Sequence, residues 1–216
     1  MQPPERRLSA LQQAAQQLGA ALGADTANRL LAYLDLLQRW NATYNLTAVR
    51  DPDEMVVQHL FDCLAVIAPL KRQAGEVGQL LDVGSGGGLP GIVIAAVCPQ
   101  WQVVCVDTVG KKAAFIRQAA AELQLRNLQG EHARVEQLQA APFDVITSRA
   151  FASLADFVHL TRPHLRSGGV WMAMKGKRPD AEIAELDGSV EVFHVEHLDV
   201  PQLSAERCIV WMRPHL

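Results

Sequence analysis

Hydrophobic residues recur at helical spacing through the first seventy residues of the chain, and the pattern then changes. Leucine, alanine and tyrosine mark one face of 8–22 and of 26–40, which predicts two amphipathic helices. Asp25 or Thr26 is expected to cap the second helix. A third helix is predicted over 53–70. These helices form a predicted N-terminal extension over 1–75, which either packs against the main domain or helps to bind a substrate.

From residue 76 to residue 216, short apolar runs alternate with amphipathic segments. Strands are expected over 79–83, 102–106, 127–131, 143–147, 170–174, 190–198 and 207–212. Helices are expected over 89–98, 111–123, 153–164 and 179–186. Pro90 suits the first turn of the first of these helices. This alternation is typical of an α/β fold, a Rossmann-like and mostly parallel seven-stranded sheet with helices on both faces.

A glycine-rich segment follows the first strand directly. It reads Asp82-Val83-Gly84-Ser85-Gly86-Gly87-Gly88-Leu89-Pro90-Gly91. Glycine permits positive φ and a close approach of backbone to a ligand. Counted from Gly86, the segment fits the G-x-G-x-x-G pattern of dinucleotide-binding folds, but that pattern needs its first glycine directly after the strand. Counted from Gly84, it fits the G-x-G-x-G pattern of methyltransferases. A glycine-rich turn without a ligand is the remaining alternative.

Two acidic residues identify the expected ligand of this segment. Asp107 ends the next strand, roughly twenty residues on, where an acid accepts hydrogen bonds from ribose hydroxyls. Asp82 precedes the loop, and a carboxylate there attracts the ammonium and sulfonium groups of S-adenosylmethionine but repels a pyrophosphate. The sequence therefore favours S-adenosylmethionine over NAD. Arg149, after the strand 143–147, is a further candidate, although a solvated arginine is the ordinary alternative.

Composition and charge bear on the partner. Hydrophobic residues make up 49% of the chain and charged residues 20%, as in an ordinary globular protein. The net charge of −3 argues mildly against a nucleic-acid binder, because phosphate neutralisation dominates the affinity of such proteins. An RNA substrate would need a local basic face.

Several features of the sequence exclude other classes. The four cysteines, Cys63, Cys98, Cys105 and Cys208, form no zinc-binding pattern, so no metal site is expected. Neither a cleavable signal peptide nor a membrane-spanning apolar run is visible, and the expected location is cytoplasmic.

The residue types that do not occur after the strand 143–147 restrict which kind of atom can accept the methyl group. No cysteine follows this strand as a nucleophile for pyrimidine carbon. An amine-methylating Asn/Asp-Pro-Pro-Tyr/Phe loop is also missing, because Ser148-Arg149-Ala150-Phe151 stands in its place. A ring nitrogen such as guanine N7 carries a lone pair and no proton, so it needs alignment and desolvation but no general base. The sequence is compatible with such a target, and no catalytic base is predicted.

Several strings together resemble one family, the bacterial small-subunit ribosomal RNA guanine-N7 methyltransferases, also called glucose-inhibited division protein B. The strings run in order from about residue 33 to 178 and are far more specific together than singly. They are Trp40-Asn41-Ala42-Thr43-Tyr44-Asn45-Leu46-Thr47, His59-Leu60-Phe61-Asp62, Asp82 through Gly91, Lys111-Lys112, Phe143-Asp144-Val145-Ile146, Ser148-Arg149-Ala150-Phe151-Ala152 and Lys175-Gly176.

The resemblance implies a class I S-adenosylmethionine-dependent methyltransferase fold with a helical N-terminal part. It implies S-adenosylmethionine as the donor and a guanine N7 of 16S ribosomal RNA, naked or in the 30S subunit, as the acceptor. The cofactor-binding residues it suggests are Gly84, Leu89, Asp107, Thr108, Val109, Val135, Glu136 and Arg149. Leu89, Val135 and Glu136 come from the resemblance alone.

The resemblance also suggests RNA contacts. Asn41, Asn45 and His59 are placed near the target base, although a buried hydrogen-bonded pair of His59 with Asp62 is an equal alternative. Local phosphate contacts are expected from Lys175, Lys177 and Arg178, together with Lys111, Lys112 and Arg117, and a solvated surface is the equal alternative for these charges. The protein is expected to act as a monomer. Methylation of a small molecule or protein, and a non-enzymatic ribosome-assembly factor that binds S-adenosylmethionine, are the alternative functions.

Overall fold

The computed structural model describes residues 4–149, 151 and 153–215. In this part of the chain, a series of helical segments precedes the first strand. They are α1 (Pro4–Gln17), α2 (Ala24–Tyr44), α3 (Pro52–Met55), the π-helical turn Val56–Phe61, α4 (Asp62–Leu64) and α5 (Ile67–Ala74). The prediction of one helix over 53–70 was wrong. A π-turn, a feature often found at functional sites, interrupts that segment, and α5 continues to Ala74.

The ends of α2 differ from the prediction. Gly23 is the N-cap, with an extended backbone and no side-chain cap, so neither Asp25 nor Thr26 caps this helix. Asp25 lies in the first turn instead, where its negative charge complements the helix dipole. At the other end Asn45 adopts the left-handed conformation, at φ 51°, and ends the helix.

Seven strands form one sheet in the order β3-β2-β1-β4-β5-β7-β6. The strands are β1 (Gly78–Val83), β2 (Trp101–Asp107), β3 (Leu128–His132), β4 (Phe143–Ser148), β5 (Leu165–Lys175), β6 (Val190–His197) and β7 (Cys208–Pro214). The first five strands of the chain are parallel to one another, and β7 is antiparallel to both of its neighbours. The predicted seven-stranded, mostly parallel sheet is therefore confirmed. Since the chain reverses its winding direction between β1 and β4, the switch point lies there.

Helices connect most of these strands. They are α6 (Gly91–Val97), α7 (Gly110–Glu122), the 3-10 turn Val135–Gln137, α8 (Leu154–Thr161), the 3-10 turn Arg162–His164 and α9 (Asp180–Ala184). Pro90 is the N-cap of α6 rather than a residue of its first turn. Strand β5 begins at Leu165, five residues before the predicted start at Val170, because a bulge in its pairing with β4 accommodates Gly168 at φ +78°.

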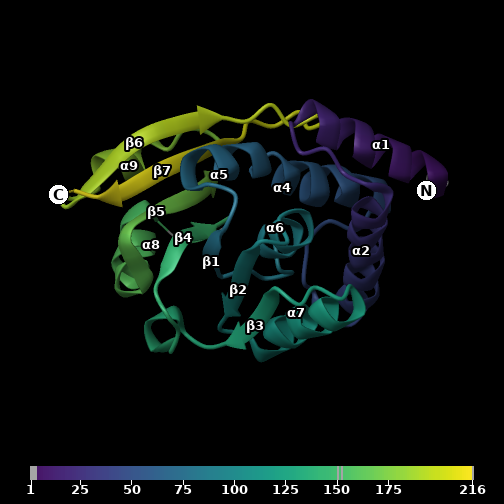
Figure 1. The fold of residues 1–216 in the computed structure, drawn as a ribbon, viewed down its shortest axis with the longest axis horizontal. Helices are drawn as coiled ribbons and strands as arrows, with labels where there is room; N and C mark the ends of the chain where they lie inside the picture. Colours follow the sequence, from purple (N-terminus) through teal and green to yellow (C-terminus); the bar gives the residue numbers. More distant parts are fainter. Residues whose placement is uncertain (1–3, 150, 152, 216) are drawn as a thin grey trace.

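Helices lie on both faces of the sheet (Figure 1), and an apolar cluster packs against each face. Neighbouring β1 residues show the alternation, because Leu80 belongs to the larger cluster and Leu81 to the smaller one. The larger cluster joins the sheet to α6, α7 and the N-terminal helices, while the smaller one packs beneath α8. Leu30 and Leu37 of α2 lie in the same cluster as Ile92 of α6, so the helical N-terminal part shares a core with the sheet. A division of the chain near residue 75 stays a prediction.

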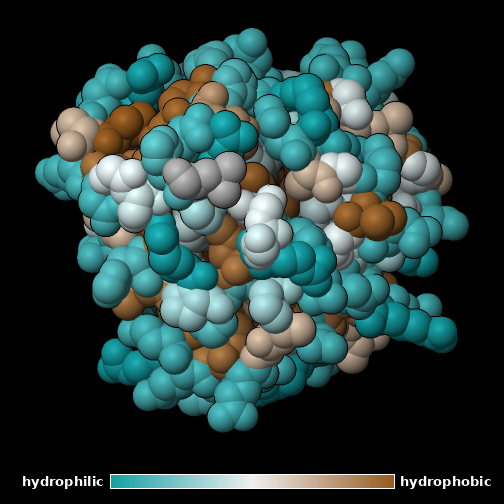
Figure 2. All heavy atoms as spheres, turned by 60° about the vertical axis from the view of Figure 1, so that its left-hand side comes forward, coloured by the Kyte–Doolittle hydropathy of each residue, from teal (hydrophilic) through white to brown (hydrophobic). Residues whose placement is uncertain are grey.

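The outer surface near α8 and the β6–β7 hairpin is predominantly hydrophilic, with hydrophobic atoms gathered in separate patches (Figure 2). Among the described helices, none combines the length and the hydropathy that a membrane span requires.

Candidate functional site

The glycine loop lies at the carboxyl end of β1. Gly84, Gly86 and Gly88 have φ values of +66°, +57° and +82°, a region that residues with a Cβ atom rarely adopt. The G-x-G-x-G spacing therefore matches three positive-φ positions. The backbone nitrogens of Gly84 and Ser85 both donate to the Val106 carbonyl of β2, which holds the loop against the neighbouring strand.

Asp107, the last residue of β2, ties this loop to the next helix. Its Oδ2 atom accepts a 3.0 Å hydrogen bond from the Gly86 nitrogen, and its Oδ1 atom accepts a 2.8 Å bond from the Val109 nitrogen. Lys112 Nζ lies 3.7 Å from Oδ2. A carboxylate oxygen accepts more than one hydrogen bond, so both oxygens retain capacity for ligand hydroxyls. The side chain is held in place before any ligand binds.

A cavity of about 380 Å³ opens beside this carboxylate, and we name it the Asp107 cavity. Six of the eight predicted cofactor residues line it: Gly84, Asp107, Thr108, Val109, Val135 and Glu136. Leu89 does not, because it is buried behind the glycine loop in the larger apolar cluster. Phe151 and Leu160 add apolar side chains to the lining of the cavity. Polar groups together with apolar side chains are what a nucleoside requires.

Asp82 is fully buried at the end of β1. Its Oδ2 atom accepts a 2.9 Å hydrogen bond from the Gly91 nitrogen at the start of α6, while its Oδ1 atom has no partner among the described residues. Burial raises the pKa of this carboxyl to about 7, against the hydrogen bond from Gly91 and the charge of Arg149, which both lower it. An orphaned buried oxygen next to the loop is a site for a hydrogen-bond donor or a cation.

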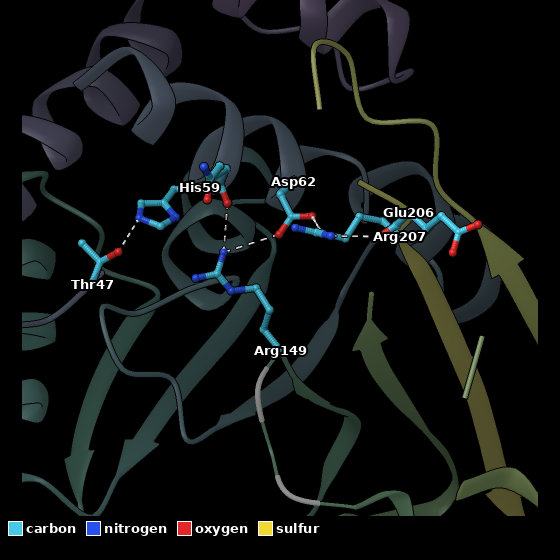
Figure 3. A network of polar contacts seen from close by, with 7 residues as sticks. Thr47, His59, Asp62, Arg149, Glu206 and Arg207 are labelled. Atoms are coloured by element: carbon cyan, nitrogen blue, oxygen red, sulfur yellow. Dashed lines mark hydrogen bonds and ion pairs between the residues drawn. The ribbon is translucent and has the colours of Figure 1, made fainter. Parts of the chain in front are cut away.

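Arg149 follows β4 but does not line the Asp107 cavity. Its Nη1 atom donates to the Gln58 carbonyl oxygen at 3.2 Å and lies 3.4 Å from Asp62 Oδ2. Asp62 Oδ1 accepts a 2.9 Å hydrogen bond from Arg207 Nε (Figure 3). One buried carboxylate thus holds two guanidinium groups, one from the end of β4 and one from the segment before β7.

These side chains line a second cavity, of about 350 Å³, which we name the Asp62 cavity. Its lining combines Gln58, His59 and Asp62 of the N-terminal helices with Arg149, Met174, Lys175, Gly176 and Arg207 of the sheet domain. The helical extension therefore forms one wall of a cavity and is not only a packing layer.

His59 lies in the π-turn and does not pair with Asp62, so of the two alternatives the hydrogen-bonded His59–Asp62 pair is wrong. Its Nε2 atom is 2.9 Å from Thr47 Oγ1, whereas Asp62 is engaged by the two arginines. The pKa of His59 is lowered to about 4, mainly by burial and also by the charge of Arg149, while a hydrogen bond with the Gln58 backbone opposes both. The imidazole is therefore neutral at pH 7.

The two asparagines expected near the target base organise the loop after α2. Asn41 is buried, and its Oδ1 atom accepts a 2.9 Å hydrogen bond from the Thr47 nitrogen. Asn45 is exposed, and its Oδ1 atom accepts a 2.9 Å hydrogen bond from Arg50 Nη2. Through Thr47, Asn41 supports the position of His59 rather than facing solvent itself.

The predicted phosphate contacts fall in two places. Lys175 lines the Asp62 cavity and pairs with Glu182 at 2.7 Å, and Arg178 pairs with Asp180 at 2.6 Å. Lys177 and Arg178 line a third cavity of about 440 Å³, the Lys177 cavity, which shares Gly176 and Arg207 with the Asp62 cavity.

The second predicted group lies around α7. Lys112 faces Asp107, and Arg117 donates to the Gly130 carbonyl oxygen at 3.0 Å. Lys111 Nζ lies 5.7 Å from the centre of the Tyr44 ring, within the range of a cation–π contact.

The cysteines do not provide a nucleophile in this structure. All four are buried and free, and burial raises the pKa of each thiol. Among the described residues, no group of histidine, cysteine and carboxylate side chains has an arrangement that would hold a metal ion.

Two residues that contact the candidate site were not predicted from the sequence. Tyr33 of α2 donates a 2.6 Å hydrogen bond to the Gly87 carbonyl oxygen in the glycine loop. Arg207 pairs with Asp62, which lies 145 residues earlier in the chain. No local pattern marks either contact, although Tyr33 lies on the apolar face of a predicted helix.

Comparison with solved structures places the fold. The chain is similar to a SAM dependent methyltransferase from Aquifex aeolicus, with a TM-score of 0.57 and 14% identity, over 75% of this chain and 93% of that one. It is also similar to TrmN from Thermus thermophilus, with a TM-score of 0.57 and 18% identity, over 71% of this chain and 49% of that one. At these identities the likeness shows a shared class I methyltransferase fold.

Sequence comparison defines the family. The family model described as rRNA small subunit methyltransferase G matches residues 26–210. A ribosomal RNA small subunit methyltransferase G from Leptothrix cholodnii is 63% identical over 99% of this chain and 97% of its own length. A protein of the same name from Methylibium petroleiphilum is 61% identical over 94% of this chain and 92% of its own length. Because the family model matches most of the chain and these relatives are more than 60% identical to it, the chain belongs to the ribosomal RNA small subunit methyltransferase G family.

Proposed function

We propose that this protein transfers a methyl group from S-adenosylmethionine to N7 of a guanine in 16S ribosomal RNA, and that it acts as a cytoplasmic monomer on naked RNA or on the 30S subunit. The observation that carries the proposal is the Asp107 cavity, which lies at the switch point of a methyltransferase sheet. Membership of the family supports the RNA acceptor, and the N7 position follows the resemblance described above.

The residues of this cavity fit the donor. Asp107 would offer two prepositioned oxygens to the ribose hydroxyls, and Val135 and Glu136, which the resemblance assigns to the adenine, line the same cavity and would hold that part of the donor. Asp82 has an orphaned Oδ1 atom but is fully buried and does not line this cavity, so it would attract the ammonium group of the methionine part through its charge rather than by direct contact. When bound, S-adenosylmethionine supplies an electrophilic methyl group. Leu89 supports the loop from behind rather than from the cavity.

The chain's own residues have a limited chemical task with this acceptor. Guanine N7 presents a lone pair and no proton, so no side chain has to remove one. Neutral His59 and the arginine-bound Asp62 are consistent with binding and orientation rather than proton transfer. The contribution of the protein is to align the two reactants and to exclude water.

Methylation of small-subunit RNA from cells that lack the enzyme tests the function. With labelled S-adenosylmethionine, we expect incorporation into 30S particles or naked 16S RNA at one guanine, with N7 identified by borohydride and aniline cleavage. Retained RNA binding without turnover would instead indicate an assembly factor, and transfer only to small molecules or proteins would exclude an RNA substrate.

A further inference from the structure

A row of cavities follows the carboxyl edge of the sheet. The Asp107 cavity shares Phe151 with a small hollow beneath α8, and that hollow shares Met174 and Lys175 with the Asp62 cavity. The Asp62 cavity in turn shares Gly176 and Arg207 with the Lys177 cavity. The Asp62 cavity therefore lies between the donor site of the proposed function and a basic outer cavity.

The charges of the Asp62 cavity leave an excess of positive charge. Two guanidinium groups, of Arg149 and Arg207, share the single carboxylate of Asp62, while Lys175 is neutralised by Glu182. In the Lys177 cavity, Arg178 has Asp180 as its partner, whereas no ion pair of Lys177 is found within the described part of the chain. Glu206 is exposed, and it contributes its backbone carbonyl, not its carboxylate, to Arg207 (Figure 3).

Arg207 is built to receive an anion. Its Nε atom donates to Asp62 at 2.9 Å and its Nη1 atom donates to the Glu206 carbonyl at 2.8 Å, which fixes the plane of the guanidinium group. Its Nη2 atom has no hydrogen-bond partner within the described residues. The side chain is 25% exposed and lines both cavities. A fixed guanidinium with free donors matches the geometry of a phosphate.

We propose that the Asp62 cavity receives the target nucleotide, turned out of its stack, and that Arg207 binds the phosphate at the boundary with the Lys177 cavity. This rests on the proposed function and names the site that its acceptor occupies. A volume of about 350 Å³ lies in the range of small-molecule pockets, and enzymes that modify a base commonly extrude it from the stack. Asp62 is a positioning residue, since it contacts the two arginines and is itself 2% exposed.

The test compares Arg207→Ala, Arg207→Lys and wild type in methyl transfer to 30S particles from cells that lack the enzyme. Arg213→Ala is the matched control, because Arg213 lies on β7, the strand that follows Arg207, is half-exposed and pairs with the surface carboxylate Glu191. We expect Arg207→Ala to raise KM for the particles about tenfold, and to reduce the slope of binding against salt by about one, as the loss of one phosphate contact does. Affinity for S-adenosylmethionine should stay unchanged.

Arg207→Lys keeps the positive charge, and it tests the same assignment if Arg207→Ala does not fold. It should restore the salt slope while KM stays raised, because lysine lacks the planar fork. An unchanged KM and salt slope in folded Arg207→Ala would overturn the assignment, as would an equal effect of Arg213→Ala. If wild type transfers no methyl group to particles or naked RNA, the proposed function fails as well. If wild type and Arg207→Ala transfer methyl groups equally well, only the assignment of the nucleotide site is overturned, and the proposed function stands.

Discussion

The hydroxyl of Tyr33 donates a 2.6 Å hydrogen bond to the carbonyl oxygen of Gly87, which joins the second N-terminal helix to the centre of the glycine loop. Tyr33 is fully buried, and Leu37, one turn further on, would lie 3.2 Å from a Cβ atom added at Gly87. The helical extension thus holds the glycine loop, whose first glycine, Gly84, lines the Asp107 cavity. Residues before the sheet are therefore in direct contact with the glycine loop.

Replacement of Tyr33 by phenylalanine should destabilise the protein by about 1 kcal/mol, the typical contribution of one hydrogen bond. For a chain of this size that corresponds to a decrease in melting temperature of roughly 2–4 °C. Differential scanning calorimetry measures it, with Tyr44→Phe as the control, because the Tyr44 side chain is exposed. Equal melting temperatures of the two variants would show that the Gly87 contact contributes nothing.

Asp107→Ala should weaken binding of S-adenosylmethionine at least tenfold, because it removes a charged hydrogen-bond acceptor worth about 1.5–3 kcal/mol. The substitution also removes the acceptor of the Gly86 and Val109 nitrogens. Isothermal titration calorimetry gives the affinity, and Glu131→Ala, an exposed acid on the neighbouring strand β3, is the control. Unchanged affinity in Asp107→Ala would show that the donor binds elsewhere.

Gly91→Ala should destabilise the protein by about 1–3 kcal/mol through overpacking. A Cβ atom there would lie 2.3 Å from Cys105 Sγ and 2.9 Å from Asp82 Oδ2, both buried. Urea unfolding measures the change in free energy. Gly188→Ala is the matched control, since nothing lies within 4 Å of its added Cβ atom. A loss in Gly188→Ala as large as that in Gly91→Ala would exclude the steric explanation.

His59 should make stability depend on pH. Its pKa is about 4 in the folded protein and 6.5 in the unfolded chain, so between these values only the unfolded chain binds the proton. Stability therefore rises with pH across this window and falls as the solution is acidified, by on the order of 3 kcal/mol over the full interval. Unfolding of wild type and His59→Gln in urea at pH 4, 5, 6 and 7 isolates this dependence. Parallel pH profiles of the two proteins would contradict the lowered pKa.

Local patterns predicted the sheet well for a physical reason. Strands buried on both faces are continuous apolar runs, and the glycine loop needs positive φ at fixed positions, so both are visible in the sequence. The interruption of the helix at Val56–Phe61 was not predictable, because a π-turn has no composition of its own. Its effect is to place His59 and Asp62 at the wall of a cavity.

The Asp62 cavity depends on contacts between residues far apart in the sequence, which no local pattern encodes. Arg149 was predicted from its place after a strand, but its partner Asp62 lies 87 residues earlier in the chain. Arg207 was missed because an arginine before an edge strand has the composition of ordinary surface, and only the fold brings it to Asp62. Asn41 was assigned to the substrate from the resemblance, yet burial places it behind Thr47.

The pairing of Asp62 with Arg207 has a consequence for the order of folding. The two residues lie 145 positions apart, and the loop that their contact closes contains β1 to β6. Contacts of such large sequence separation cost loop-closure entropy before they stabilise the fold. A partly folded chain can therefore have β1 paired with β2, and Asp107 at its place on the sheet edge, while the Asp62 cavity still lacks Arg207.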